Sequence, residues 1–137
     1  MKLRVVAAGT FVLLTLTIAS FFTSCGGSSK TNAEPTLTVT TTPANGSTQA
    51  PAVGPTFPLN VTITSAMPAK GVTISIKATP DGSATTFFTD TKSTTAKSND
   101  FIVKDQEVGN VNVVSITVTS NSTASNVWTG SYRYSAK

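Results

Sequence analysis

The chain has 137 residues, of which only 12% are charged, and a formal net charge of +4. It contains no histidine and a single cysteine, so it lacks the commonest general base and metal ligand and cannot form an internal disulfide. Two of its ten basic residues, Lys2 and Arg4, precede a long apolar run, and no cluster of Lys or Arg follows that run, which argues against nucleic acid as a partner.

The first 25 residues have the pattern of an export leader. After the two basic residues comes an uncharged apolar run from Val5 to Phe22, slightly shorter than the roughly 20 residues that span a bilayer. The run ends in Phe22-Thr23-Ser24-Cys25, which resembles the lipobox of bacterial lipoproteins. The resemblance implies that residues 1–24 are a signal peptide, removed after the thiol of Cys25 is joined to diacylglycerol. Two or three acyl chains, at about 0.8 kcal/mol for each buried methylene, hold a protein durably on a membrane.

Other interpretations of this stretch stay open. An uncleaved membrane anchor and an ordinary secretory signal both fit a basic leader followed by an apolar run. A buried free thiol at Cys25 is the remaining alternative, although Gly26-Gly27-Ser28-Ser29 offers it no apolar surroundings.

Residues 25–34, CGGSSKTNAE, are small and polar and predict a flexible tether with a reach of roughly 15 to 18 Å. Gly26 stands where the Asp that favours inner-membrane retention is found in enterobacterial lipoproteins. The resemblance therefore implies a lipid-anchored protein of the cell envelope, at the outer membrane, with periplasmic and surface-exposed orientations both open.

From residue 35 onward the chain alternates apolar and polar residues with a period of two, the pattern of half-buried strands. The predicted inward rows are Leu37 and Val39; Phe57, Leu59, Val61 and Ile63; Val72, Ile74, Ile76 and Ala78; and Val114, Ile116 and Val118. Residues 84–91 are a candidate short strand, residues 91–99 are polar and predict a loop, and residues 101–103 resume strand character. The last predicted strand covers residues 127–135.

About seven short strands over roughly 100 residues predict an all-β fold, an immunoglobulin-like β-sandwich of about seven strands spanning residues 35–137. The segments PTLTVTTTPANGS, FPLNVTITSAMPAKGVTISI and VSITVTSNSTASNVWTGSYRY are similar to the small Ig-like domains of Bacteroidetes surface and envelope proteins. Because this fold hosts many functions, the resemblance implies the architecture alone.

The sequence offers little for catalysis. No serine lies in a Gly-x-Ser-x-Gly turn, and no glycine-rich phosphate loop follows a strand, so an enzyme is not predicted. Asp100, Asp105 and Glu107 are close together and carry oxygen ligands of the kind that Ca²⁺ prefers. Solvated charges at strand ends are the favoured explanation of these carboxylates, and neither a metal ion nor a cofactor is predicted.

Three aromatic residues, Trp128, Tyr132 and Tyr134, share one face of the last predicted strand. Exposed, they would form a stacking platform for sugar rings and imply a glycan partner. Buried, they belong to the core, which the alternation with polar residues between them favours.

The sequence thus predicts a cell-envelope lipoprotein with a non-catalytic Ig-like module for protein interaction, adhesion or envelope structure. Its expected partners are the membrane, through lipid on Cys25, and an envelope or surface protein that contacts its sheet faces or open edge strands. The alternative is a carbohydrate-binding accessory lipoprotein that uses Trp128, Tyr132 and Tyr134.

Overall fold

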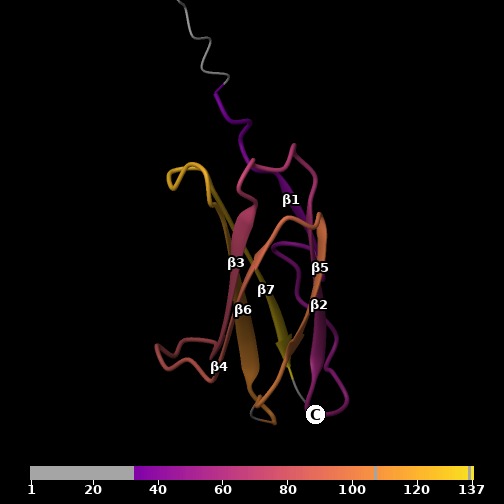
Figure 1. Cartoon of the computed structure of the whole chain (residues 1–137). Coiled ribbons are helices and arrows are strands. Elements are labelled where there is room, and N and C mark those ends of the chain that lie inside the picture. Colours follow the sequence, from indigo (N-terminus) through magenta and orange to yellow (C-terminus); the bar gives the residue numbers. More distant parts are fainter. Residues whose placement is uncertain (1–32, 107, 136) are drawn as a thin grey trace, which may run out of the picture. The chain divides into compact units, whose positions relative to one another are not determined.

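The computed structural model describes residues 33–106, 108–135 and 137, and every regular element in this part of the chain is a β-strand (Figure 1). The strands are β1 (Val39–Thr42), β2 (Phe57–Ile63), β3 (Val72–Pro80), β4 (Phe88–Thr94), β5 (Ser98–Val103), β6 (Val111–Ser120) and β7 (Val127–Ser135).

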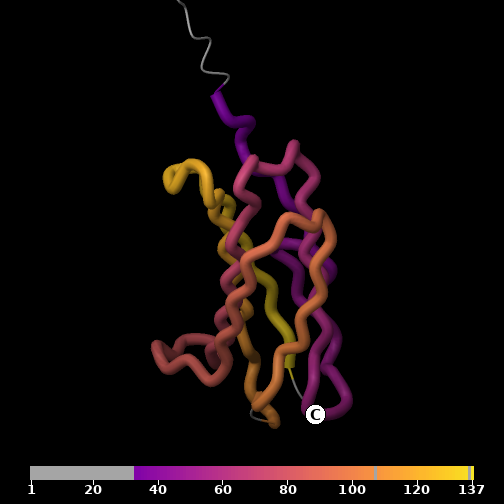
Figure 2. Tube along the Cα trace, viewed as in Figure 1, coloured from indigo at the N-terminus to yellow at the C-terminus, as the bar shows by residue number. Residues whose placement is uncertain are grey.

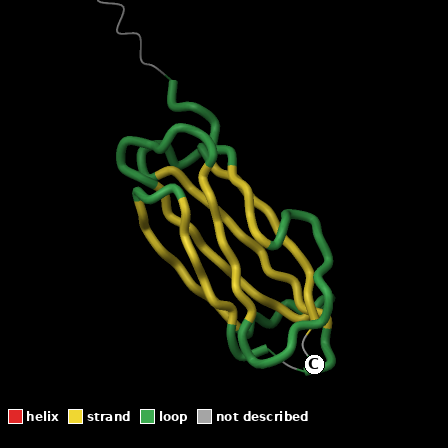
Figure 3. Tube along the Cα trace, turned by 90° about the vertical axis from the view of Figure 1, so that its right-hand side faces the viewer, coloured by secondary structure: helices red, strands yellow, loops and turns green. Residues whose placement is uncertain are grey.

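The strands form two sheets in which every neighbouring pair is antiparallel. One sheet has the order β1-β2-β5 and the other the order β4-β3-β6-β7. The two sheets pack face to face, with connecting loops gathered at the two ends (Figure 2, Figure 3). The predicted all-β sandwich of about seven strands is confirmed.

The inner faces of the sheets carry the alternating apolar residues that the sequence predicts. Their side chains form one buried cluster to which both sheets contribute: Leu37, Phe57, Leu59, Val61, Ile63, Val72, Ile74, Ile76, Ala78, Phe101, Val103, Val114, Ile116, Val118, Tyr132 and Tyr134. Each large aliphatic side chain in this cluster contributes about 1.5 to 3 kcal/mol when fully buried, before conformational entropy opposes it. The cluster holds the two sheets together without a disulfide.

The chain leaves the three-stranded sheet after β1 and crosses to the other one. Residues 46–52 run beside the outer edge of β7, where Gly46 N donates to Ser131 O at 2.7 Å and Gln49 N donates to Arg133 O at 2.8 Å. Thr48 forms a parallel bridge with Arg133. This segment covers much of the edge that β7 would otherwise expose, which leaves β4 and β5 as the longest open edges.

The prediction of a loop at residues 91–99 is wrong. Most of that stretch lies in β4 and β5, and only residues 95–97 connect the two strands, which belong to different sheets. The alternation fails in β4 because its five central residues are all exposed. In β5 the inner row begins with a polar residue, Asn99, which is buried and donates from Nδ2 to Ala96 O at 2.9 Å.

The first described residues and the C-terminus lie at opposite ends of the sandwich (Figure 1). At the N-terminal end, Asn126 of the β6–β7 turn accepts a hydrogen bond from Leu37 N at 2.9 Å and donates one to the Glu34 carboxylate at 2.6 Å. At the other end, Lys137 N donates to Ala52 O at 3.0 Å. Any site near Ala52 therefore lies at the end of the domain farthest from residue 34.

Candidate functional site

Cys25, the predicted lipidation site, lies outside the described residues, as does the whole of the predicted signal peptide. Within residues 33–106, 108–135 and 137, there is no helix with the length and apolarity to cross a membrane. The anchor stays a prediction from the sequence.

The structure buries two of the three aromatic residues predicted as a row. Tyr132 is 1% exposed and Tyr134 is 0% exposed. The ring of Phe57 stacks on that of Tyr134 with centroids 4.4 Å apart and an angle of 25°, and it lies 5.7 Å from that of Tyr132. A platform for sugar rings needs exposed ring faces. These two tyrosines are core residues, as the alternation favours, and only Trp128 reaches the surface.

Burial also changes the acidity of both tyrosines. Desolvation raises the pKa of the Tyr134 hydroxyl to about 12. Desolvation, reinforced by the neighbouring Tyr134, raises the pKa of Tyr132 further. Neither hydroxyl has a hydrogen-bond partner among the described residues. Both groups are therefore neutral at physiological pH.

Trp128 is half-buried and packs against the core at the start of β7. Its indole ring covers Gly130, where a β-carbon would collide with the ring and lie 2.9 Å from Asn45 Oδ1. Asn45 Oδ1 in turn accepts a hydrogen bond from Ser131 N at 2.8 Å. Glycine at position 130 thus makes room for the indole, and Trp128 serves to close the sandwich at this point.

The carboxylates considered as calcium ligands are placed in ordinary structural roles where they are described. Asp100 Oδ1 accepts a hydrogen bond from Asn60 Nδ2 at 2.7 Å on the outer face of the β1-β2-β5 sheet. Asp105 follows β5 with a left-handed φ of 60°, a conformation that Asp tolerates in turns. Glu107 lies outside the described residues. Within the described part of the chain, no three His, Cys, Asp or Glu side chains come together in a group that could hold a metal ion.

The best candidate site is a pocket of about 650 Å³ where β1 ends and β2 begins. Three parts of the chain build it: the end of β1 with the segment that follows, the first half of β2, and the middle of β5. Its lining is Thr42, Pro43, Gln49, Ala52, Val53, Thr56, Phe57, Pro58, Leu59, Asn60, Asp100, Phe101 and Ile102. Most of these side chains are apolar, which is typical of sites that bind organic groups or protein side chains.

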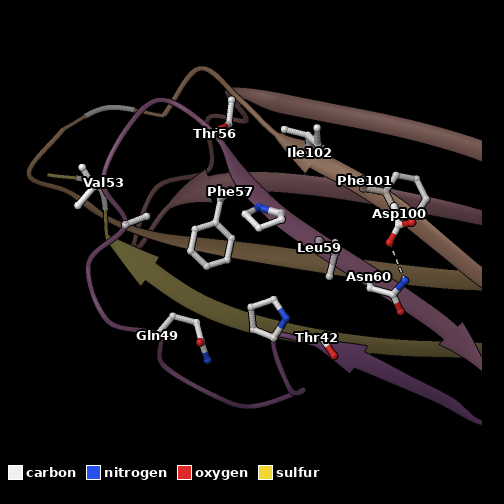
Figure 4. Close-up of a pocket in the computed structure, with 13 residues that line it drawn as sticks. Thr42, Gln49, Val53, Thr56, Phe57, Leu59, Asn60, Asp100, Phe101 and Ile102 are labelled. Atoms are coloured by element: carbon white, nitrogen blue, oxygen red, sulfur yellow. Dashed lines mark hydrogen bonds between the residues drawn. The ribbon is translucent and has the colours of Figure 1, made fainter.

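The pocket combines an aromatic centre with a polar rim. Figure 4 shows Phe57 in the middle, Val53 on the loop side, and the hydrogen bond between Asn60 and Asp100 on the opposite side. The other face of Phe57 packs against the buried tyrosines, so its ring is held in place from behind. Asp100 is the one charged residue of the lining.

The loop that forms one wall of the pocket is fixed by hydrogen bonds to its main-chain groups. Ala52 N donates to Ser135 O at 2.8 Å, and Gln106 Nε2 donates to Gly54 O at 2.7 Å. Val53 lies between these two attachments and is 90% exposed, while Ile102 on the facing strand is 51% exposed. Two large apolar side chains are thus presented to solvent beside a preformed hollow, which is typical of an interaction site.

The sequence did not point to this pocket. Its walls come from residues 42–60 and 100–102, which are distant in the chain and meet only because β5 pairs with β2. The one available signal was the pair Val53 and Ile102. At both positions a large apolar residue stands where the sequence predicts an exposed side chain. The turn pattern predicts exposure at Val53, and the strand alternation predicts it at Ile102.

Comparison of the chain with protein-family models and with curated proteins finds no match. The case for a function therefore rests on the geometry of the domain and on the pattern of the first 25 residues.

Proposed function

We propose that the protein is a cell-envelope lipoprotein, anchored through lipid on Cys25, whose Ig-like sandwich is a non-catalytic module for binding another envelope or surface protein. The observation that supports this proposal best is the apolar pocket around Phe57, with Val53 and Ile102 exposed at its rim.

The position of the pocket suits a tethered binding module. The tether predicted at residues 25–34 leads into the end of the domain where Glu34 is bound by Asn126, and the pocket is at the opposite end. A partner could then reach the pocket without approaching the lipid surface.

The chemistry of the pocket indicates the kind of partner. An apolar side chain fits the space against Phe57, and a basic side chain next to it would pair with the exposed carboxylate of Asp100. We therefore expect a protein segment in which a large apolar residue and a Lys or Arg lie close together.

The anchor is tested by the intact mass of the protein extracted from membranes of its native host. A chain that begins at Cys25 and carries diacylglycerol and acyl mass is expected, and a Cys25→Ser variant should lose that mass. An unlipidated, soluble wild-type protein would contradict the anchor and leave the pocket to be tested separately.

The binding site is tested with a photo-crosslinking amino acid at position 53, and with the same residue at Thr129 on the outer face of the other sheet as the control. A specific envelope protein should be captured from position 53 and not from position 129. With that protein purified, Ile102→Asp and Asp100→Lys should each weaken binding at least tenfold. Equal capture from both positions, or full affinity in both variants, would rule out the pocket as the binding site.

A further inference from the structure

The outer edge of β4 carries main-chain groups that pair with no other strand in the described part of the chain. β4 is the end strand of its sheet, and among residues 33–106, 108–135 and 137 its one paired strand is β3. The hydrogen bonds from Asn121 N to Gly71 O and from Asp81 N to Val111 O show that odd-numbered residues of β3 bond to β6. Even-numbered residues of β3 therefore bond to β4, since successive residues of an antiparallel strand bond to opposite sides. In β4 this leaves the N–H and C=O groups of Thr89, Thr91 and Ser93 directed outward.

The side chains of β4 restrict what can pair with this edge. Asp90 and Lys92 pair across the sheet with the buried Ile76 and Ile74, so they are on the side of β4 that faces the other sheet, yet both are exposed. The Lys92 ammonium lies 5.9 Å from the centre of the Phe101 ring. Inward charges on an edge strand discourage pairing with most strands, because an uncharged partner would leave them desolvated and unpaired. A compatible strand must offer the opposite charges at the same spacing.

We propose that this strand is β4 of a second copy of the chain, paired antiparallel about a two-fold axis at Thr91. In that register Thr91 faces Thr91 of the second copy, and Thr89 faces Ser93. Each of these pairs joins outward-directed groups and exchanges two hydrogen bonds. Asp90 of each copy then lies opposite Lys92 of the other, so the same ion pair forms twice. The contact is isologous and closes as a dimer.

The other two-fold registers of β4 are less favourable. An axis at Asp90 sets Asp90 against Asp90, and an axis at Lys92 sets Lys92 against Lys92, so each brings like charges together. An axis at Thr89 or Ser93 shortens the ladder and leaves the opposite charges unpaired.

The open edge of β5 does not satisfy the same test. Ile63 N donates to Lys97 O, which fixes Ser98, Asp100 and Ile102 as the residues with outward main-chain groups. The central register of β5 with itself sets Asp100 against Asp100. Charge complementarity therefore selects β4, and the selection does not depend on the proposed lipid anchor or on the pocket.

Cysteine crosslinking in the full chain tests the register. Facing residues that exchange hydrogen bonds in an antiparallel pair have α-carbons about 5.5 Å apart, within the range that a disulfide or a short bis-maleimide spans. Thr91→Cys alone should give a covalent dimer. Thr89→Cys protein alone and Ser93→Cys protein alone should each give little covalent dimer. A mixture of the two variants should crosslink, because residue 89 of one copy faces residue 93 of the other. Wild-type protein, whose one cysteine is Cys25, and Thr129→Cys on the outer sheet face are the controls.

Charge reversal tests the ion pairs. In the Thr91→Cys protein, Asp90→Lys should lower the crosslinking yield at least tenfold, because it sets lysine against lysine. The exchange Asp90→Lys with Lys92→Asp should restore the yield, and Asp100→Lys, the same charge change on the other open edge, should leave it unchanged. The proposal is overturned if Thr91→Cys crosslinks no better than Thr129→Cys. It is equally overturned if Asp90→Lys has no effect or if the exchange fails to restore crosslinking in folded protein.

Discussion

Burial of the two tyrosines at the end of β7 stabilises the fold through their rings and not through their hydroxyl groups. Tyr134 stacks on Phe57, while its hydroxyl is buried without a hydrogen-bond partner among the described residues. A buried, unpaired polar group costs about 1 to 3 kcal/mol. Tyr134→Phe keeps the ring and removes the hydroxyl, so the free energy of unfolding should stay the same or rise by about 1 kcal/mol in urea titrations.

A control distinguishes the ring from the hydroxyl. Tyr134→Ala removes the stacked ring and should lower the free energy of unfolding by about 3 to 5 kcal/mol. If Tyr134→Phe instead destabilises the protein by more than about 1 kcal/mol, the hydroxyl makes an interaction that contributes to stability.

The same burial predicts a loss of stability at high pH. The pKa of Tyr134 is raised from 10.0 to about 12 in the folded protein, and that of Tyr132 is raised as well. A raised pKa means that the native state holds the proton more tightly, so this contribution is complete below pH 10 and is lost as the pH rises through about 12. Absorbance at 295 nm should show no tyrosinate near pH 10, because these are the only tyrosines in the chain. The double variant Tyr132→Phe, Tyr134→Phe should unfold at a higher pH than the wild type, as followed by circular dichroism.

Gly130 is required by the position of the Trp128 ring. A β-carbon at residue 130 would overlap that ring and crowd Asn45 Oδ1. Gly130→Ala should therefore cost about 1 to 3 kcal/mol and shift the emission of the single tryptophan to longer wavelength as the indole moves into water. In a Trp128→Leu background the same substitution should cost much less. Equal costs in both backgrounds would mean that the indole is not the obstacle.

At the scale of elements, residues 34–37 are attached to the β6–β7 turn through Asn126. Its Nδ2 donates to Glu34 and to Pro35 O, and its Oδ1 accepts from Leu37 N. Hydrogen bonds from Ser120 first, and then from Asn126 and Thr123, lower the pKa of the Glu34 carboxyl below 4.5. These bonds stabilise the fold above pH 4.5, and that contribution is lost as the pH falls through the lowered pKa. Asn126→Ala should raise the pKa of Glu34 toward its ordinary value in an NMR titration, whereas Ser122→Ala in the same turn should not.

An element could be predicted from the sequence where its packing imposes a pattern of apolar and polar side chains along the strand. β2, β3 and β6 each bury one face, so their apolar residues alternate and the sequence predicted them. β4 is exposed on both faces and is held by main-chain bonds to β3, which any residue type can make. Residues 46–52 pair with β7 in the same way. Main-chain hydrogen bonds carry no side-chain pattern. The sequence therefore predicted β4 only in part, as a candidate strand at residues 84–91, and it did not predict the pairing of residues 46–52 with β7.

The same distinction applies to the candidate site. The aromatic row on β7 was recognised because it follows a strand period within nine residues. The pocket was not recognised, because it depends on the pairing of β2 with β5, whose facing residues Leu59 and Phe101 are far apart in the chain. A site built by tertiary pairing cannot be found from local periodicity.

At the scale of the whole molecule, the stability of the domain depends far more on buried apolar side chains than on pairs of charged residues. Only 12% of the residues are charged, and within the described residues the one ion pair is that of Arg133 with Asp81, at 3.2 Å, with both side chains about half exposed. Exposed pairs of this kind contribute about 0 to 1 kcal/mol. The proposed contact between two copies differs in this respect, because its register is chosen by two pairs between Asp90 and Lys92.

Added salt should therefore weaken the association of two copies while leaving the stability of the fold nearly unchanged. The Debye length falls from about 10 Å at 0.1 M to about 3 Å at 1 M salt, which screens exposed charges and leaves apolar burial intact. Between 0.05 M and 0.5 M NaCl, the free energy of unfolding should change by less than about 1 kcal/mol. Over the same range the initial rate of crosslinking of the Thr91→Cys protein should fall several-fold. A crosslinking rate that does not respond to salt would show that Asp90 and Lys92 do not select the contact, and a parallel loss of stability would mean that charge contributes more to the fold than its buried core suggests.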